Sequence, residues 1–182
     1  MELNRAFDST LAVLAKVQPA QLGARTPCAS WDVRALINHF TGTTRWWAGT
    51  LDGHGEPATE DFAAGDFVAA YEESIQIATA AFGADGAQAK LVQLPWGEFP
   101  GAVVFAMATM EQFTHGWDLA KAIGLDTDLD PEFAVELLGT AKVAITDMHR
   151  GADGEALFGP VRAAPAGASA ADQLAAFLGR SV

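Results

Sequence analysis

The sequence has very little cysteine and no long apolar run. Its 182 residues include one cysteine, Cys28, which excludes an internal disulfide. No apolar stretch approaches the ~20 residues needed to cross a bilayer, because the run from Val103 to Met110 is followed at once by Glu111. The beginning of the chain also lacks the basic start and unbroken apolar segment of a signal peptide. We therefore expect a cytoplasmic protein with no membrane partner.

Basic residues are scarce as well. Eleven Lys and Arg compare with 23 Asp and Glu, which gives a formal net charge of -12 at pH 7. This charge repels phosphate backbones, so nucleic acid is excluded from the expected partners. Half of the residues are apolar and 19% are charged, which excludes disorder caused by low hydrophobicity. The length fits one domain, or one domain with a small appendage.

Apolar residues recur at helical spacing along most of the chain. They predict five helices, over about residues 3–17, 32–49, 67–83, 100–123 and 131–150, and a short one near 174–178. The fifth carries Ile145 and Met148 on its apolar side. A short hairpin is expected around Pro95-Trp96-Gly97. The pattern predicts an all-α four-helix bundle with extra C-terminal helices and at most minor strand content, with the bundle over 1–150 and a tail over 151–182 packed on it.

The fourth predicted helix carries two polar residues at the centre of its apolar face. Glu111 and His115 are four residues apart, so their side chains converge on one point. A buried carboxylate and imidazole need a compensating cation, hydrogen-bond network or metal ion. An internal ion pair between the two residues explains the pattern equally well.

A metal site of this kind requires a third residue, because catalytic zinc sites usually have three protein ligands and an exchangeable water. His39 lies near the middle of the predicted second helix, on the flank of its apolar stripe, at the bundle level of Glu111 and His115. A single histidine is more often hydrogen-bonded or at the surface than a ligand. If all three bind one ion, their ligand atoms lie within ~4 Å of one another.

Other chemically active residues have two interpretations each, and no catalytic residue is assigned. Asp118, one turn after His115, either orients that imidazole or pairs with an arginine such as Arg34. Cys28 is either a nucleophile at a helix N-terminus or, as we favour, a small apolar residue of a turn. Solvated or capping positions are expected for two histidines, and pocket or packing positions for four tryptophans: His54, His149, Trp31, Trp46, Trp96 and Trp117.

Two blocks of the sequence resemble a known family. They are Thr26-Pro27-Cys28-x-x-Trp31-Asp32-Val33-Arg34-x-Leu36-x-x-His39 and Glu111-x-x-x-His115-Gly116-Trp117-Asp118-Leu119-Ala120-x-Ala122-x-Gly124. The chain resembles the N-terminal metal-binding domain of the mycothiol-dependent maleylpyruvate isomerase family, within the DinB-like superfamily of metal-binding four-helix bundles. Its closing segments resemble an uncharacterised actinobacterial branch: Phe158-Gly159-Pro160 and Leu174-x-x-Phe177-Leu178-Gly179-Arg180.

The resemblance implies that His39, Glu111 and His115 are metal ligands. It implies a divalent ion, with zinc expected and nickel, iron or manganese as alternatives. It also implies mycothiol or a similar low-molecular-weight thiol as cosubstrate, for transfer or isomerisation on a small molecule. The isomerase has a separate C-terminal domain that contributes to its active site, whereas this chain has a short tail. A hydrolase with a metal-activated water and a non-catalytic metal-binding protein therefore stay open, as does a homodimer.

Overall fold

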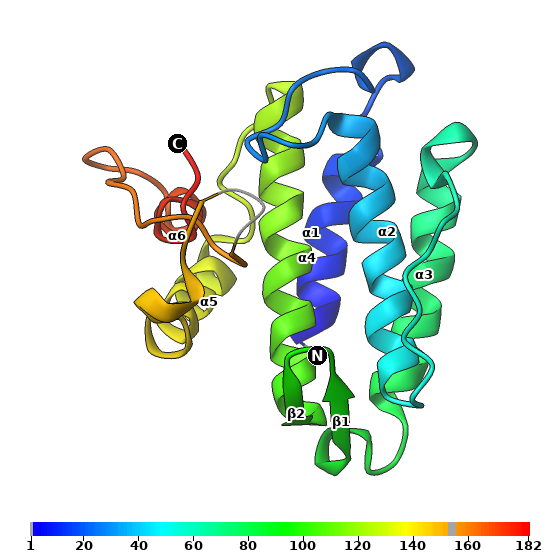
Figure 1. The fold of residues 1–182 in the computed structure, drawn as a ribbon. Coiled ribbons are helices and arrows are strands. Elements are labelled where there is room, and N and C mark those ends of the chain that lie inside the picture. The colour runs from blue at the N-terminus through cyan, green and yellow to red at the C-terminus, as the bar shows by residue number, and fades with distance from the viewer. Residues whose placement is uncertain (1, 153–155) are drawn as a thin grey trace. The chain divides into compact units, whose positions relative to one another are not determined.

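The structure is a computed structural model that describes residues 2–152 and 156–182 (Figure 1). By its internal contacts the chain forms two compact units, and each is described by itself. Unit 1 comprises Met1–Lys16 and Arg34–Gly116, and unit 2 comprises Val17–Val33 and Trp117–Val182. Both units are built from two separate stretches of sequence, and neither is divided from the other near residue 150. The predicted division at residue 150 and the packing of the tail stay predictions. Residues 153–155 of that predicted tail lie outside the described residues.

Four helices contribute to the bundle of unit 1, which includes α4 as far as Gly116, and Figure 1 shows them side by side. They are α1 (Glu2–Leu14), α2 (Val33–Thr50), α3 (Phe67–Gly83) and α4 (Gly101–Ile123). The predicted four-helix bundle is thus confirmed. Across the described residues, no helix combines the length and the apolar character needed to cross a membrane.

Aromatic residues from three helices meet in the core of unit 1. Tyr71 of α3 makes edge-on contacts with Phe7 of α1 and Phe40 of α2, at centroid distances of 6.1 and 4.9 Å. All three side chains are less than 2% exposed. Burying one large apolar side chain stabilises the fold by about 1.5–3 kcal/mol. These contacts fix α2 against its neighbours and so place the residues that α2 contributes to the site.

Gly116 allows α1 to approach α4 closely. A Cβ atom at this position would lie 2.4 Å from Thr10 Oγ1 and 3.1 Å from Thr10 Cα, which is too close for any other residue without displacement. At the same contact, Thr10 Oγ1 donates a hydrogen bond of 2.7 Å to the Gln112 carbonyl oxygen. The glycine therefore fixes the depth at which α4 packs, one residue after His115.

A small hairpin precedes α4, as the sequence predicts. Strands β1 (Leu91–Leu94) and β2 (Gly97–Pro100) pair antiparallel, with Leu91 opposite Pro100. Pro95 and Trp96 form the two-residue connection, and Gly97 follows with a φ of 146° that favours glycine. This is the minor strand content expected of an all-α protein.

Unit 2 contains the extra C-terminal helices that the sequence predicts. They are α5 (Pro131–Ala144) and α6 (Ala170–Phe177), which pack against each other. In each helix the side chain of the residue before the first turn caps the N-terminus. Asp130 accepts a hydrogen bond from the Phe133 backbone N–H, and Ser169 accepts one from that of Asp172.

The predicted fifth helix is too long at its C-terminus. We expected Ile145 and Met148 on its apolar side, but α5 ends at Ala144 and Ile145 is extended, with φ -103° and ψ 107°. Met148 is 86% exposed. The cause is local, because His149 Nδ1 accepts a hydrogen bond of 3.1 Å from the Thr146 backbone N–H. Such side-chain bonds to the backbone compete with helix continuation.

Candidate metal centre

Helix α4 is buried on all its sides near the site. Every residue from 112 to 120 is buried, so a polar residue there has no solvent-facing side of the helix available. His115 is 7% exposed, and the Glu111 side chain, one turn earlier, is 17% exposed. The helical spacing of four residues therefore places both groups in the interior, as the sequence predicts.

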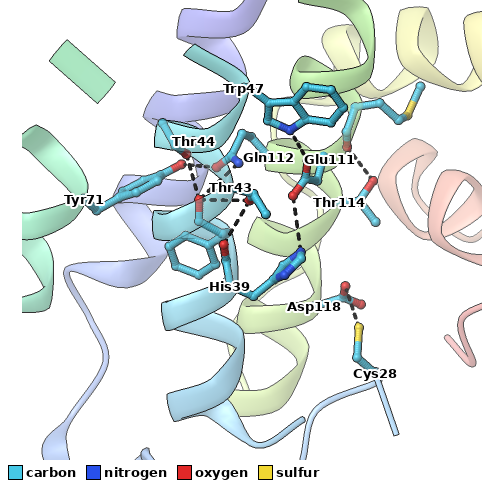
Figure 2. A network of polar contacts seen from close by, with 12 residues as sticks. Cys28, His39, Thr43, Thr44, Trp47, Tyr71, Glu111, Gln112, Thr114 and Asp118 are labelled. Atoms are coloured by element: carbon cyan, nitrogen blue, oxygen red, sulfur yellow. Dashed lines mark hydrogen bonds and ion pairs between the residues drawn. The ribbon is translucent and has the colours of Figure 1, made fainter. Parts of the chain in front are cut away.

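His39 approaches the same point from α2. Its neighbours Leu36 and Phe40 are fully buried, which leaves His39 on the flank of the apolar stripe with its side chain 28% exposed. Its Nε2 atom lies 3.3 Å from Glu111 Oε1, and its ring lies 4.8 Å from that of His115 at an interplanar angle of 85°. Figure 2 shows the His39 and Glu111 side chains pointing toward each other.

The structure brings the three predicted ligand residues together. One ligand atom from each of His39, Glu111 and His115 lies within 4.8 Å of the other two. Two atoms held at about 2.0–2.2 Å from one tetrahedral ion would be roughly 3.4 Å apart, close to the His39–Glu111 distance. The 4.8 Å bound for the whole set is wider than the ~4 Å expected of three ligands on one ion. That all three residues bind a metal therefore stays a prediction.

Glu111 Oε1 provides an independent test of whether a cation fits this point. The atom is buried and accepts no hydrogen bond within the described part of the chain, although His39 Nε2 is 3.3 Å away. A buried acceptor left unsatisfied costs about 1–3 kcal/mol, more when it is charged. Two imidazoles and one carboxylate are also a donor set that Zn²⁺ accepts in catalytic sites. The residues present therefore fit a divalent cation.

The charge state of Glu111 favours the same chemistry. Burial raises the pKa of Glu111, whereas the neighbouring His39 and the charge of His115 lower it. The lowering is the larger effect, so the pKa lies below its ordinary value. The carboxyl group is consequently ionised near neutral pH. A metal ligand must be deprotonated, and this one already is.

The indole of Trp47 contacts the same carboxylate from the other side. Trp47 Nε1 donates a hydrogen bond to Glu111 Oε2, as Figure 2 shows. This contact could not be predicted from the sequence, because a tryptophan on an apolar stripe usually serves packing. No spacing rule separates an indole that only packs from one whose N–H reaches a carboxylate on another helix.

A buried polar network holds α2, α3 and α4 in register next to the site. The Tyr71 hydroxyl donates to Gln112 Oε1 at 2.8 Å, and Gln112 Nε2 donates to the Phe40 carbonyl oxygen at 3.3 Å (Figure 2). Phe40 and Gln112 directly follow His39 and Glu111 in sequence. The network thus couples the backbone positions of two candidate ligands.

In unit 2, Asp118 has partners that the sequence did not identify. Its fully buried carboxylate accepts hydrogen bonds from Arg180 Nε and Nη2 at 3.2 and 3.0 Å. The alternative partner, Arg34, pairs instead with Asp61. Whether Asp118 also orients His115 stays a prediction.

Cys28 joins the Asp118 and Arg180 cluster within unit 2. Its Sγ donates to Asp118 Oδ2 at 3.3 Å (Figure 2). Arg180 Nη2 lies 3.9 Å from the sulfur. Burial and the charge of Asp118 raise the pKa of the thiol to about 12, against a smaller lowering by Arg180. A nucleophile at a helix N-terminus requires the opposite shift, so the environment agrees with the turn residue that we favoured.

We expect Cys28 to resist alkylation in the folded protein. With a pKa of about 12, the thiolate fraction near pH 8 is roughly one part in 10⁴. The rate of reaction with iodoacetamide at pH 8 should therefore be more than about 100-fold lower in buffer than in urea. Mass spectrometry of the alkylated chain measures both rates. Equal rates would contradict the buried, protonated thiol.

The remaining histidine and tryptophan candidates are not among the three converging residues. His54 is exposed in the loop after α2, and His149 caps the turn after α5. Trp46, Trp47 and Trp96 pack together in unit 1, with centroids 4.6 to 6.4 Å apart. These distances are those of rings in direct contact, so Trp46 and Trp96 pack against each other and against Trp47.

Comparison with known proteins assigns the family. The fold and the interior residues define a helical-bundle protein with a candidate His-Glu-His metal centre. A family model described as the mycothiol maleylpyruvate isomerase N-terminal domain matches residues 3–120. The chain belongs to this family.

Similar proteins include both sequence relatives and solved structures. Two uncharacterized proteins from strains of Mycobacterium tuberculosis are 40% identical over 186 residues, covering 100% of this chain and 97% of theirs. The crystal structure of the mycothiol-dependent maleylpyruvate isomerase superposes with a TM-score of 0.54 at 19% identity. A histidine-to-alanine mutant of that enzyme gives 0.57 at 18% identity. Each match covers 75% of this chain but 66% of the isomerase chain, and at this identity it supports the fold.

Proposed function

We propose that this chain is a metal-dependent enzyme that binds a low-molecular-weight thiol of the mycothiol type and uses it for transfer or isomerisation on a small molecule. The observation that carries the proposal is the meeting of His39, Glu111 and His115, with a buried Glu111 oxygen whose partner is the His39 imidazole at 3.3 Å, without a hydrogen bond of good geometry. Family membership and the mycothiol dependence named for the isomerase structures support the thiol.

The three residues would hold the ion through two imidazole nitrogens and one carboxylate oxygen. Zinc is the expected ion, because two histidines and one glutamate form a known catalytic zinc set. When bound, a divalent ion supplies positive charge that favours the thiolate form of a thiol near neutral pH. The single negative charge of Glu111 leaves that positive charge in excess.

The surrounding residues prepare the site without taking part in bond formation. Trp47 holds one oxygen of Glu111 in place. The Tyr71–Gln112–Phe40 network fixes the backbone that carries His39 and Glu111. Burial of His115 limits access of water to the same point. A thiol bound at this point would therefore be shielded from bulk solvent by the residues around His115.

The test measures metal and thiol binding on the purified chain. We expect about one Zn²⁺ per chain by elemental analysis, and mycothiol binding by calorimetry that is lost after removal of the metal. S-methylated mycothiol is the matched control, because it keeps the rest of the molecule and lacks the ionisable S–H group. Mycothiol binding that is unchanged without metal contradicts the proposal. Bound metal with no thiol affinity favours the hydrolase or the non-catalytic metal-binding protein.

A further inference from the structure

The two oxygens of Glu111 have different surroundings. Oε2 accepts the indole N–H of Trp47, whereas Oε1 lies toward His39 Nε2 and accepts no hydrogen bond within the described residues (Figure 2). An ionised carboxylate can offer both oxygens to one cation or only one of them. Here Oε2 already accepts a hydrogen bond from a neutral donor, the Trp47 indole.

The Trp47 side chain is held in this position by its packing. Its side chain is 6% exposed and packs edge-on against Trp46, with centroids 4.6 Å apart, and against Trp96 at 6.4 Å. Trp46 is itself fixed, because its Nε1 donates a hydrogen bond of 2.9 Å to the Gly55 carbonyl oxygen. An indole nitrogen is a donor only, so the contact has one polarity and also favours the ionised carboxylate.

We propose that Trp47 is a positioning residue that reserves Glu111 Oε2 and leaves Oε1 alone to bind a metal ion. The inference rests on the proposed function. A ligand restricted to one oxygen leaves more positions on an ion for exchangeable groups than a ligand that offers two. Partners of this kind, which touch a ligand and not the ion, typically change metal affinity by about 10- to 100-fold.

Trp46 provides a matched control within the same cluster. Trp46 and Trp47 are adjacent residues of α2 in the same aromatic cluster, and each indole N–H is used. Only the N–H of Trp47 reaches Glu111, whereas that of Trp46 reaches a loop carbonyl. A purely structural role predicts similar effects of removing either indole, and a positioning role predicts a difference.

The experiment compares Trp47→Phe with Trp46→Phe in the full chain. We expect Trp47→Phe to weaken Zn²⁺ binding by about 10- to 100-fold in competition with a chromogenic chelator, and Trp46→Phe by less than about 3-fold. The visible absorption of bound Co²⁺ should change only in Trp47→Phe, because a freed Oε2 alters the coordination. Equal affinities and spectra in the two variants would overturn the inference.

A measurement on the wild type covers the case in which Trp47→Phe does not fold. In metal-free protein, the indole N–H proton of Trp47, assigned by triple-resonance NMR, should exchange with solvent far more slowly than that of half-exposed Trp96. Comparable exchange rates would overturn the inference. Failure of the wild type to bind Zn²⁺ overturns the proposed function as well, whereas equal variants on a zinc-binding wild type overturn only the role of Trp47.

Discussion

Replacing His115 with alanine is expected to abolish metal binding and activity together while the bundle stays folded. His115 is 7% exposed on α4, and alanine is the best helix former, so the helix itself is not weakened. Loss of a direct ligand should cost more than the roughly 100-fold that loss of a ligand's own partner costs. Elemental analysis measures the bound zinc, and far-UV circular dichroism measures the fold.

His54→Ala is the control for this change. His54 is exposed in the loop after α2, so the same substitution there should leave zinc content and helicity at the wild-type level. A His115→Ala variant that keeps its full complement of metal would contradict the metal centre. Equally, a wild type without metal whose His115→Ala variant is more stable would identify Glu111 and His115 as a structural pair.

Replacing Arg180 with alanine is expected to lower the free energy of unfolding by about 3–5 kcal/mol. Arg180 is the cation that compensates the fully buried carboxylate of Asp118, through Nε and Nη2. Burial lowers the pKa of Arg180, but Asp118 raises it more, so the guanidinium stays charged. Without it, a negative charge is left in the interior. Urea denaturation followed by circular dichroism measures the difference.

Arg162→Ala is the corresponding control in the same C-terminal region. Arg162 is exposed, and its Nε donates one hydrogen bond of 2.9 Å to the Gly179 carbonyl oxygen. Losing one such bond should cost about 0.5–1.5 kcal/mol. If the two arginine variants prove equally stable, the buried pair contributes no more than a surface contact, and the importance given to Arg180 is wrong.

The helices could be predicted because their apolar stripes are long and end at clear signals. Residues 67–83 carry such a stripe, and the observed helix α3 has these bounds. The prediction failed at Ile145, where stripe spacing continued but the Thr146–His149 contact ended the helix. Periodicity indicates which face of a helix is apolar. It contains no information on whether a local hydrogen bond, such as the one between Thr146 and His149, is more stable than one more helical turn.

The candidate site was predictable only as far as helical spacing reaches. Glu111 and His115 are a single turn apart, so one helix is enough to bring them together. Trp47 and Arg180 were missed because their partners, Glu111 and Asp118, lie 64 and 62 positions away in sequence. Contacts across such separations depend on how elements pack, and a single sequence carries no direct signal of them.

The protonated state of Cys28 has a practical consequence for following the proposed chemistry. The chain has one sulfhydryl group, and with a pKa of about 12 it stays silent toward thiolate-specific reagents at neutral pH. A chromogenic disulfide added to the folded protein together with its cosubstrate would thus count the small thiol alone. Because the folded protein contributes no thiol signal of its own, the free cosubstrate can be counted in samples withdrawn at intervals from unmodified protein.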